Sequence, residues 1–181
     1  MAQGGGERKP LPMRRLEPES LLQALAEEGV EYIVVGGYAV AAHGFPRATK
    51  DIDICPRPSE GNLRSLASAL EKLEAEAIGL EEFAGEFDLR PDLKGLKLGG
   101  NWTLMTKHGR LDVMQDLEGL GENGTGGWVE LRPHAVKRSF LGHECLFCSY
   151  EDLLKMKTAA DRDQDRVDVK TLKAQRHDLT P

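Results

Sequence analysis

Two carboxylates separated by one residue are the most informative feature of this chain. Asp51 and Asp53 lie in the segment TKDIDI, residues 49–54, whose alternation of polar and apolar residues is typical of a β-strand. Residues at positions i and i+2 of a strand point to the same face, so both carboxylates could hold one cation. Carboxylates this close repel each other unless a cation or protons neutralise them. The pair therefore predicts a Mg²⁺ or Mn²⁺ site that takes its remaining ligands from a nucleoside triphosphate (NTP).

A third carboxylate, Asp112, is expected on a separate strand. Residues 107–109 are flanked by two β-favouring segments, which predicts a hairpin. Leu111 and Val113 share one strand face, so Asp112 lies on the other, where a partner strand could place it beside the first two carboxylates. Asp116 is a lower-ranked alternative, because no apolar pair flanks it. Three converging carboxylates indicate a two-metal site for phosphoryl transfer.

Two glycines precede the carboxylate strand. Residues 32–35 (YIVV) form a β-rich apolar run, Gly36-Gly37 follows, and residues 38–43 have a helical composition. Paired glycines let a ligand approach the backbone closely, and free N–H groups at a helix start attract anions. A Gly-Gly pair alone is weak evidence, but before the Asp motif it predicts a cradle for phosphate oxygens.

Together these motifs resemble the core of the nucleotidyltransferase superfamily, which includes DNA polymerase β, tRNA CCA-adding enzymes and AbiEii-type toxins. The motifs that carry the resemblance are, in chain order, Gly36-Gly37, Arg47, Thr49, Asp51-Ile52-Asp53 and Leu111-Asp112-Val113. The match spans roughly residues 16–116 and extends more weakly to the C-terminal helices. Many members have Gly-Ser where this chain has Gly-Gly, so only backbone donors remain here for phosphate.

The resemblance implies roles for individual residues. Asp51, Asp53 and Asp112 are expected to be the catalytic, metal-binding residues, with Asp112 assisting deprotonation of the acceptor hydroxyl. The residues expected to contact the nucleotide are Gly36, Gly37, Arg47, Thr49 and Lys157. Lys157 could reach a phosphate from a helix that Ser149 begins, although an ordinary surface lysine fits the pattern equally well.

The implied reaction moves a nucleoside monophosphate from an NTP to an acceptor hydroxyl, and the sequence leaves the acceptor open. An RNA 3′ end such as that of tRNA, a protein or a small molecule such as an aminoglycoside antibiotic would fit. The resemblance also allows a toxin of a toxin–antitoxin pair, with an antitoxin partner. The alternative is a noncatalytic nucleotide-binding or regulatory module with the same fold. A glycosyltransferase metal motif would explain Asp51 and Asp53 but neither Gly36-Gly37 nor Asp112.

The order of expected elements predicts an α+β fold, in which a nucleotidyltransferase-like mixed β-sheet is flanked by helices and followed by a small C-terminal helical segment. Residues 1–15 are expected to be a disordered lead-in, 16–148 the main domain, and 149–181 the helical segment packed on it. Apolar residues at helical spacing predict a helix over 60–77. The glycine-rich residues 119–127 predict an irregular, mobile loop.

Composition narrows the class of protein. The chain has 181 residues, of which 40% are hydrophobic, and a formal net charge of −6, which argues against nonspecific coating of nucleic acid. It shows no apolar run of membrane-spanning length and no signal peptide, so we expect a cytoplasmic protein without membrane contact. Cys145-x-x-Cys148 with His143 nearby could suggest a zinc site, but the chain has no second Cys pair and the segment is typical of a strand, so free thiols are the favoured interpretation. A local basic surface could use Arg47, Lys50, Lys107, Arg110, Lys137, Arg138, Lys155 and Lys157.

Overall fold

The computed structural model describes residues 14–79 and 90–178. The expected disordered lead-in over residues 1–15 lies, apart from its last two residues, outside the described part. The strands of the main sheet are β1 (Tyr32–Val35), β2 (Asp51–Pro56), β3 (Glu76–Ala77), β4 (Asn101–Thr106), β5 (Gly109–Met114), β8 (Val136–Phe140) and β9 (His143–Phe147). They form a seven-stranded sheet in the order β3-β4-β5-β2-β1-β9-β8. The sheet is mixed, because β2 pairs parallel with β5 but antiparallel with β1.

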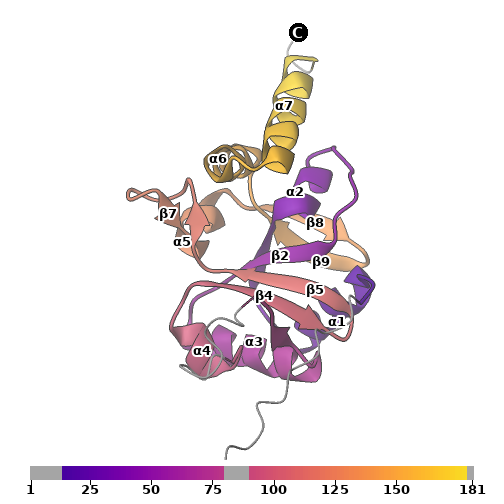
Figure 1. Cartoon of the computed structure of the whole chain (residues 1–181), viewed down its shortest axis with the longest axis vertical. Helices are drawn as coiled ribbons and strands as arrows, with labels where there is room; N and C mark the ends of the chain where they lie inside the picture. The colour runs from indigo at the N-terminus through magenta and orange to yellow at the C-terminus, as the bar shows by residue number, and fades with distance from the viewer. Residues whose placement is uncertain (1–13, 80–89, 179–181) are drawn as a thin grey trace, which may run out of the picture.

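Helices lie on both sides of this sheet. The described helices are α1 (Pro18–Glu27), α2 (Gly36–Ala42), α3 (Glu60–Lys72), α4 (Leu93–Lys97), α5 (Trp128–Leu131), α6 (Tyr150–Ala160) and α7 (Asp163–Asp178). Figure 1 shows α1, α3 and α4 on one side of the sheet and α2 and α6 on the other, with α7 extending away from the sheet. The expected α+β architecture is confirmed, with helices flanking a mixed sheet and ending the chain.

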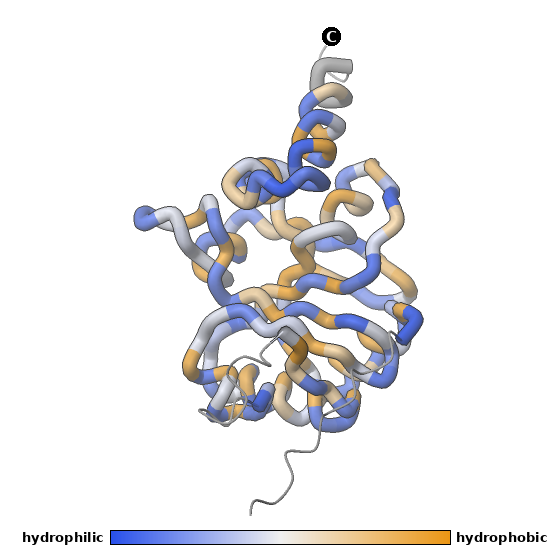
Figure 2. The backbone as a smooth tube through the Cα atoms, viewed as in Figure 1, coloured by the Kyte–Doolittle hydropathy of each residue, from blue (hydrophilic) through white to orange (hydrophobic). Residues whose placement is uncertain are grey.

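The hydrophobic core follows from strand alternation. Ile52 and Ile54 of β2 are fully buried and pair with Leu111 and Val113 of β5, which are also fully buried. The same core cluster contains apolar residues of α1 and α3. Figure 2 shows the hydrophobic residues concentrated along the strands, whereas the turn between α6 and α7 is hydrophilic. Burial of one sheet face therefore fixes which side chains the opposite face presents.

Two expectations from the sequence are wrong in detail. The helix expected over 60–77 ends at Lys72, because Glu74 takes a left-handed conformation (φ 53°) and the chain reverses into β3. The loop expected over 119–127 is shorter, because residues 119–124 connect the strands of a small hairpin, β6 (Leu117–Glu118) and β7 (Thr125–Gly126), and its mobility stays a prediction. Gly119, Gly121 and Gly124 supply the positive φ angles of this hairpin loop. A high glycine content is typical both of such a turn and of an irregular loop, so the sequence alone does not separate the two.

The C-terminal helices share the core with the sheet. Leu153 and Met156 of α6 and Leu172 of α7 are buried in the core cluster. The Ser149 hydroxyl accepts a hydrogen bond from the Asp152 backbone N–H, the N-cap that the sequence predicts. The division at residues 148 and 149 stays a prediction. Across the described ranges, no helix has the length and apolar character needed to cross a bilayer.

Asn62 generates a prediction about stability. Its side chain is buried at 7% exposure and makes three hydrogen bonds of 2.7 to 2.8 Å, two to the Glu31 backbone and one to the Arg57 carbonyl. Asn62→Ala leaves these backbone groups without their partner, so we expect a loss of about 2 kcal/mol in the free energy of unfolding. Chemical denaturation measures it. Arg64→Gln, on the exposed side of the same helix, is the control and should cost less than about 0.5 kcal/mol. Equal losses in the two variants would contradict the role given to Asn62.

Candidate active site

The three expected carboxylates meet on one face of the sheet. In the parallel register of β2 and β5, Asp53 lies opposite Asp112, and Asp51 lies opposite Arg110. Neighbouring strands are about 4.8 Å apart, so the cluster spans two adjacent strands. The face opposite this cluster carries the buried residues Ile52 and Ile54. The structure thus brings together the residues that the sequence selects, while their catalytic roles stay a prediction.

Burial and mutual repulsion make it costly for all three carboxyl groups to be ionised at once. Burial, followed by the charges of Asp51 and Asp112, raises the pKa of Asp53 to about 7. Burial also raises the pKa of Asp112, which is only 6% exposed, although Arg110 opposes the shift. A positive charge nearby stabilises the ionised form of such carboxylates.

Arg110 supplies one such charge. Its Nε donates to Asp112 Oδ1 over 2.9 Å and its Nη2 donates to Asp112 Oδ2 over 2.7 Å, while Nε lies 3.6 Å from Asp51 Oδ2. From the sequence, Arg110 is expected only as one of the candidate cations of a basic surface. The missed signal is its position two residues before Asp112, because strand alternation puts both side chains on one face.

The carboxylate oxygens of the cluster are suitable ligands for a divalent cation, but Arg110 lies among them in the structure. Carboxylate oxygens are the ligands that Mg²⁺ and Mn²⁺ prefer. Among the described residues, however, no group of three His, Cys, Asp or Glu side chains is arranged to hold a metal ion. The Arg110 guanidinium instead lies between Asp112 and Asp51. The positive charge beside Asp112 and Asp51 in the structure is therefore that of Arg110.

The glycine pair begins α2 directly beside Asp53. Gly36 has a φ of +63°, and a Cβ atom there would overlap the Asp53 carboxylate. The backbone N–H of Gly37 donates to that carboxylate and thereby lowers its pKa against the effect of burial. The turn therefore places the first N–H groups of α2 at the carboxylate cluster. The predicted contact of Gly36 and Gly37 with phosphate is untested.

Thr49 occupies the space beside Gly37 and contacts the carboxylate cluster. The Thr49 hydroxyl donates to Asp51 Oδ1 over 3.0 Å, which orients that carboxylate. A Cβ atom at Gly37 would lie only 2.6 Å from Thr49 Oγ1. The threonine hydroxyl therefore takes the space in which a serine side chain would begin.

The two cations expected to contact the nucleotide are both paired with α7. Arg47 Nη2 donates to Asp168 Oδ2 over 3.0 Å. Lys157 Nζ lies 2.7 Å from Asp165 Oδ1 and 3.0 Å from Asp168 Oδ2. Lys157 is also close enough to Asp53 to lower its pKa, although burial, Asp51 and Asp112 raise it more strongly. Both cations therefore lie near the carboxylate cluster, and their contact with a nucleotide stays a prediction.

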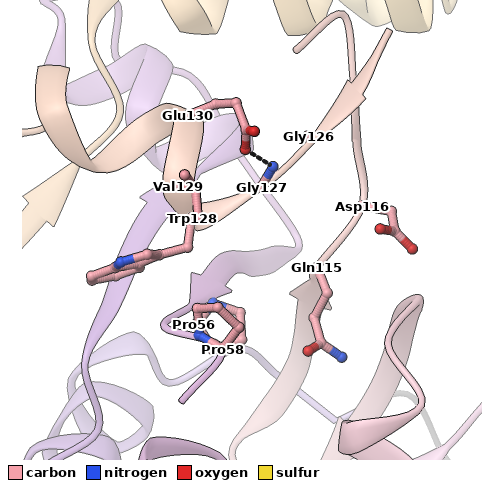
Figure 3. A pocket seen from close by; sticks show the side chains of 9 residues that line it. All are labelled: Pro56, Pro58, Gln115, Asp116, Gly126, Gly127, Trp128, Val129 and Glu130. Carbon is pink, nitrogen blue, oxygen red and sulfur yellow. Dashed lines mark hydrogen bonds between the residues drawn. The ribbon is translucent and has the colours of Figure 1, made fainter. Parts of the chain in front are cut away.

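A shallow cavity of about 340 Å³ lies beyond the carboxyl ends of β2 and β5 (Figure 3). Its walls are Pro56 and Pro58, Gln115 and Asp116, and residues 126–130. Figure 3 shows the Trp128 ring on one side of the cavity and the Asp116 carboxylate on another. Asp116, the lower-ranked alternative to Asp112, therefore belongs to this cavity.

Cys55 connects the cavity with the carboxylate cluster. It lies two residues after Asp53 on β2, which puts both side chains on one sheet face and about 7 Å apart along the strand. Burial and the charges of Glu130 and Asp116, two residues of the cavity wall, raise the pKa of Cys55 to about 12. The cavity and the carboxylates thus flank one short stretch of the same strand.

Comparison with solved structures identifies the fold. The lincosamide antibiotic adenylyltransferase LnuA, in its lincomycin-bound crystal structure, matches 88% of this chain and 98% of its own, with a TM-score of 0.55 and 18% identity. A nucleotidyltransferase-fold protein from Thermotoga maritima matches 91% of this chain and 97% of its own, with a TM-score of 0.52 and 16% identity. Neither a protein-family model nor a curated protein matches the chain.

The chain therefore has the nucleotidyltransferase fold, as the resemblance in its motifs implies. Identities of 16 to 18% show the architecture alone and leave the activity to be argued from this chain's own residues. The more specific likeness to AbiEii-type proteins stays a prediction.

Gly36 generates the prediction for this site, and Gly29 provides a matched control. Both glycines have left-handed φ angles, +63° and +65°, but a Cβ at Gly29 meets no atom within 4 Å. Gly29→Ala should lose about 1 to 2 kcal/mol of stability from backbone strain alone. Gly36→Ala should lose a further 1 to 3 kcal/mol, or roughly the usual cost of overpacking, because Asp53 must move. Thermal and chemical denaturation measure the difference. Equal losses in the two variants would show that the overlap of the new Cβ with Asp53 does not lower the stability of Gly36→Ala.

Proposed function

We propose that this protein is a nucleotidyltransferase that moves a nucleoside monophosphate from an NTP to an acceptor hydroxyl. The observation that carries the proposal is the carboxylate cluster of Asp51, Asp53 and Asp112 beside the glycine turn of a nucleotidyltransferase fold. In this reaction the acceptor oxygen bonds to the α-phosphorus, the bond from that phosphorus to the bridging oxygen breaks, and pyrophosphate leaves. The acceptor proton passes to a nearby base.

Each site residue has a proposed part. Asp51 and Asp53 would hold one divalent ion and Asp112 would help to hold a second, and such ions neutralise phosphate charge and activate the attacking hydroxyl. Asp112 would accept the acceptor proton. Thr49 keeps the Asp51 carboxylate oriented by its 3.0 Å hydrogen bond. Lys157 would bind a phosphate oxygen. Positioning and charge neutralisation supply most of the acceleration in such chemistry, so few side chains are needed.

A small molecule is the acceptor that the surroundings of the site favour. The cavity near Cys55 has about the volume of a small organic molecule, and its acidic residues Asp116 and Glu130 would repel a nucleic acid backbone. The similar LnuA structure holds lincomycin, a small antibiotic. An RNA 3′ end, a protein acceptor and an antitoxin partner are predictions that rest on the family resemblance alone.

A noncatalytic nucleotide-binding module is the second candidate. The observation in its favour is that Arg110 already neutralises Asp112 with two short hydrogen bonds. In such a module the cluster would need no second metal ion, and the fold would serve binding only. The glycosyltransferase reading of Asp51 and Asp53 is disfavoured by the nucleotidyltransferase fold.

Metal-dependent nucleotide binding is the first consequence of the proposal. ATP or another NTP should bind with Mg²⁺ or Mn²⁺, and the double variant Asp51→Asn, Asp53→Asn should lose at least about tenfold in affinity because it removes two anionic metal ligands. Isothermal titration calorimetry with metal and with EDTA measures this. Asp163→Asn, which changes a fully exposed carboxylate, is the control. Equal ATP affinity with EDTA and in the double variant would exclude a metal site at these carboxylates.

Asp112 separates the enzyme from the binding module. If its role lies mainly in the transition state, Asp112→Asn should retain ATP affinity within a few-fold and lose at least about 100-fold in transfer rate. Transfer from labelled NTPs to pools of small molecules, RNA and protein, analysed by mass spectrometry, measures the rate and identifies the acceptor. Binding of ATP by the wild-type protein without transfer to any pool would favour the noncatalytic module. Unchanged turnover in Asp112→Asn would exclude Asp112 as a catalytic residue.

A further inference from the structure

The strongest feature outside the carboxylate cluster is a buried group of charges between α6, α7 and the loop after α2. Asp168 of α7 is 2% exposed and Asp165 is 5% exposed. Both face Lys157 of α6, whose side chain is 11% exposed. Charges buried this deeply are costly to desolvate, and each is kept by close partners from another segment.

Asp168 is the centre of this group. It accepts hydrogen bonds from Arg47, Lys157 and Gln164, with Nη2, Nζ and Nε2 each 3.0 Å from one of its oxygens. Burial opposes its ionisation, yet these three donors together keep the pKa of Asp168 below its ordinary value. One carboxylate thus joins α7 to the preceding helix α6 and to the loop after α2, whose Arg47 lies 121 positions earlier in the sequence.

The ion pairs with Asp165 and Asp168 orient Lys157. An ammonium group has three donors, and Asp165 and Asp168 take two of them. Among the described residues, Lys157 has no third acceptor, while its charge acts on Asp53. The two aspartates therefore restrict a flexible side chain to orientations in which one donor is left for a ligand.

The tie between Asp168 and Arg47 reaches the metal-binding carboxylates through a loop. Arg47 contacts Asp168 with Nη2 and reaches its own neighbour, the Ala48 carbonyl, with Nη1 over 3.0 Å. Two residues later, the Thr49 hydroxyl donates to Asp51 Oδ1. Fixing Arg47 therefore fixes the backbone that carries Thr49, and Thr49 sets the orientation of Asp51.

We propose that Asp168 is a positioning residue for nucleotide binding, acting through Lys157 on the phosphate side and through Arg47 and Thr49 on the metal side. This inference rests on the proposed nucleotidyltransferase function. The carboxylate that positions these residues is then on α7, more than a hundred residues after Arg47, Thr49 and Asp51. Outer partners of this kind change ligand or metal affinity about 10- to 100-fold when they are removed.

The test compares Asp168→Asn with a control on the same helix. Asp163→Asn changes a fully exposed carboxylate that, within the described part of the chain, pairs only with exposed Arg166. Calorimetry with Mg²⁺ and a non-hydrolysable ATP analogue should show at least tenfold weaker binding for Asp168→Asn and a change within twofold for Asp163→Asn. Thermal denaturation of both variants reports stability separately. A lower melting temperature of Asp168→Asn with wild-type affinity would reduce Asp168 to a structural role and overturn the proposal.

A double-mutant cycle tests whether Asp168 acts through Lys157. Lys157→Gln and Asp168→Asn should each weaken binding. The double variant should weaken binding by less than the product of the two single effects, because both changes remove one shared arrangement. Effects that multiply would show independent roles and overturn the coupling.

Arg47→Gln keeps the proposal testable if Asp168→Asn does not fold. It should weaken Mn²⁺ binding, measured by electron paramagnetic resonance, at least threefold, and unchanged Mn²⁺ affinity would overturn the loop tie.

The wild-type protein separates this inference from the proposed function. Absence of ATP-analogue binding by wild-type protein with Mg²⁺ or Mn²⁺ would overturn the nucleotidyltransferase proposal and the positioning role with it. Binding by the wild type that is retained in full by Asp168→Asn would overturn the positioning role alone. Tenfold weaker binding in that variant, with the control unchanged, supports both.

Discussion

Electrostatic repulsion among three carboxylates on one sheet face is the constraint on which the rest of this structure depends. Asp51, Asp53 and Asp112 lie together because the opposite faces of their strands are fully buried in the core. Hydrophobic burial sets the register, and the register concentrates negative charge at one place. The protein offsets that charge with Arg110 and with a backbone N–H donor from the start of α2.

Much of this arrangement could be predicted from the sequence because it follows from alternation. A period of two residues puts Asp51 and Asp53 on one face, and the apolar neighbours of Asp112 select its face in the same way. The N-cap at Ser149 and the hairpin turn at residues 107–109 depend on local chemistry, so they could be predicted as well. What could be predicted is thus local or periodic.

The features that could not be predicted depend on the conformation of single residues or on contacts between distant segments. Strand alternation puts Arg110 on the same face as Asp112, but it does not show whether the guanidinium binds that carboxylate or solvent. The end of α3 at Lys72 depends on the left-handed turn at Glu74, although apolar spacing continues to Leu73. The pairing of Arg47 with Asp168 joins residues 121 positions apart. Such contacts depend on the folded chain, since sequence periodicity carries no information about the partner.

The balance of charge also explains why each cation at the site has an anionic partner. Arg110 is held by Asp112, and Lys157 is held by Asp165 and Asp168. A nucleotide and its metal ions would bring both signs of charge at once. Metal ions would take over the neutralisation of the carboxylates, which frees Arg110, while phosphate oxygens would meet the donor that Lys157 has left. Lys157 is held by acidic residues outside the cluster, so it would keep its position on ligand binding, whereas the partners of Arg110 are the cluster carboxylates themselves.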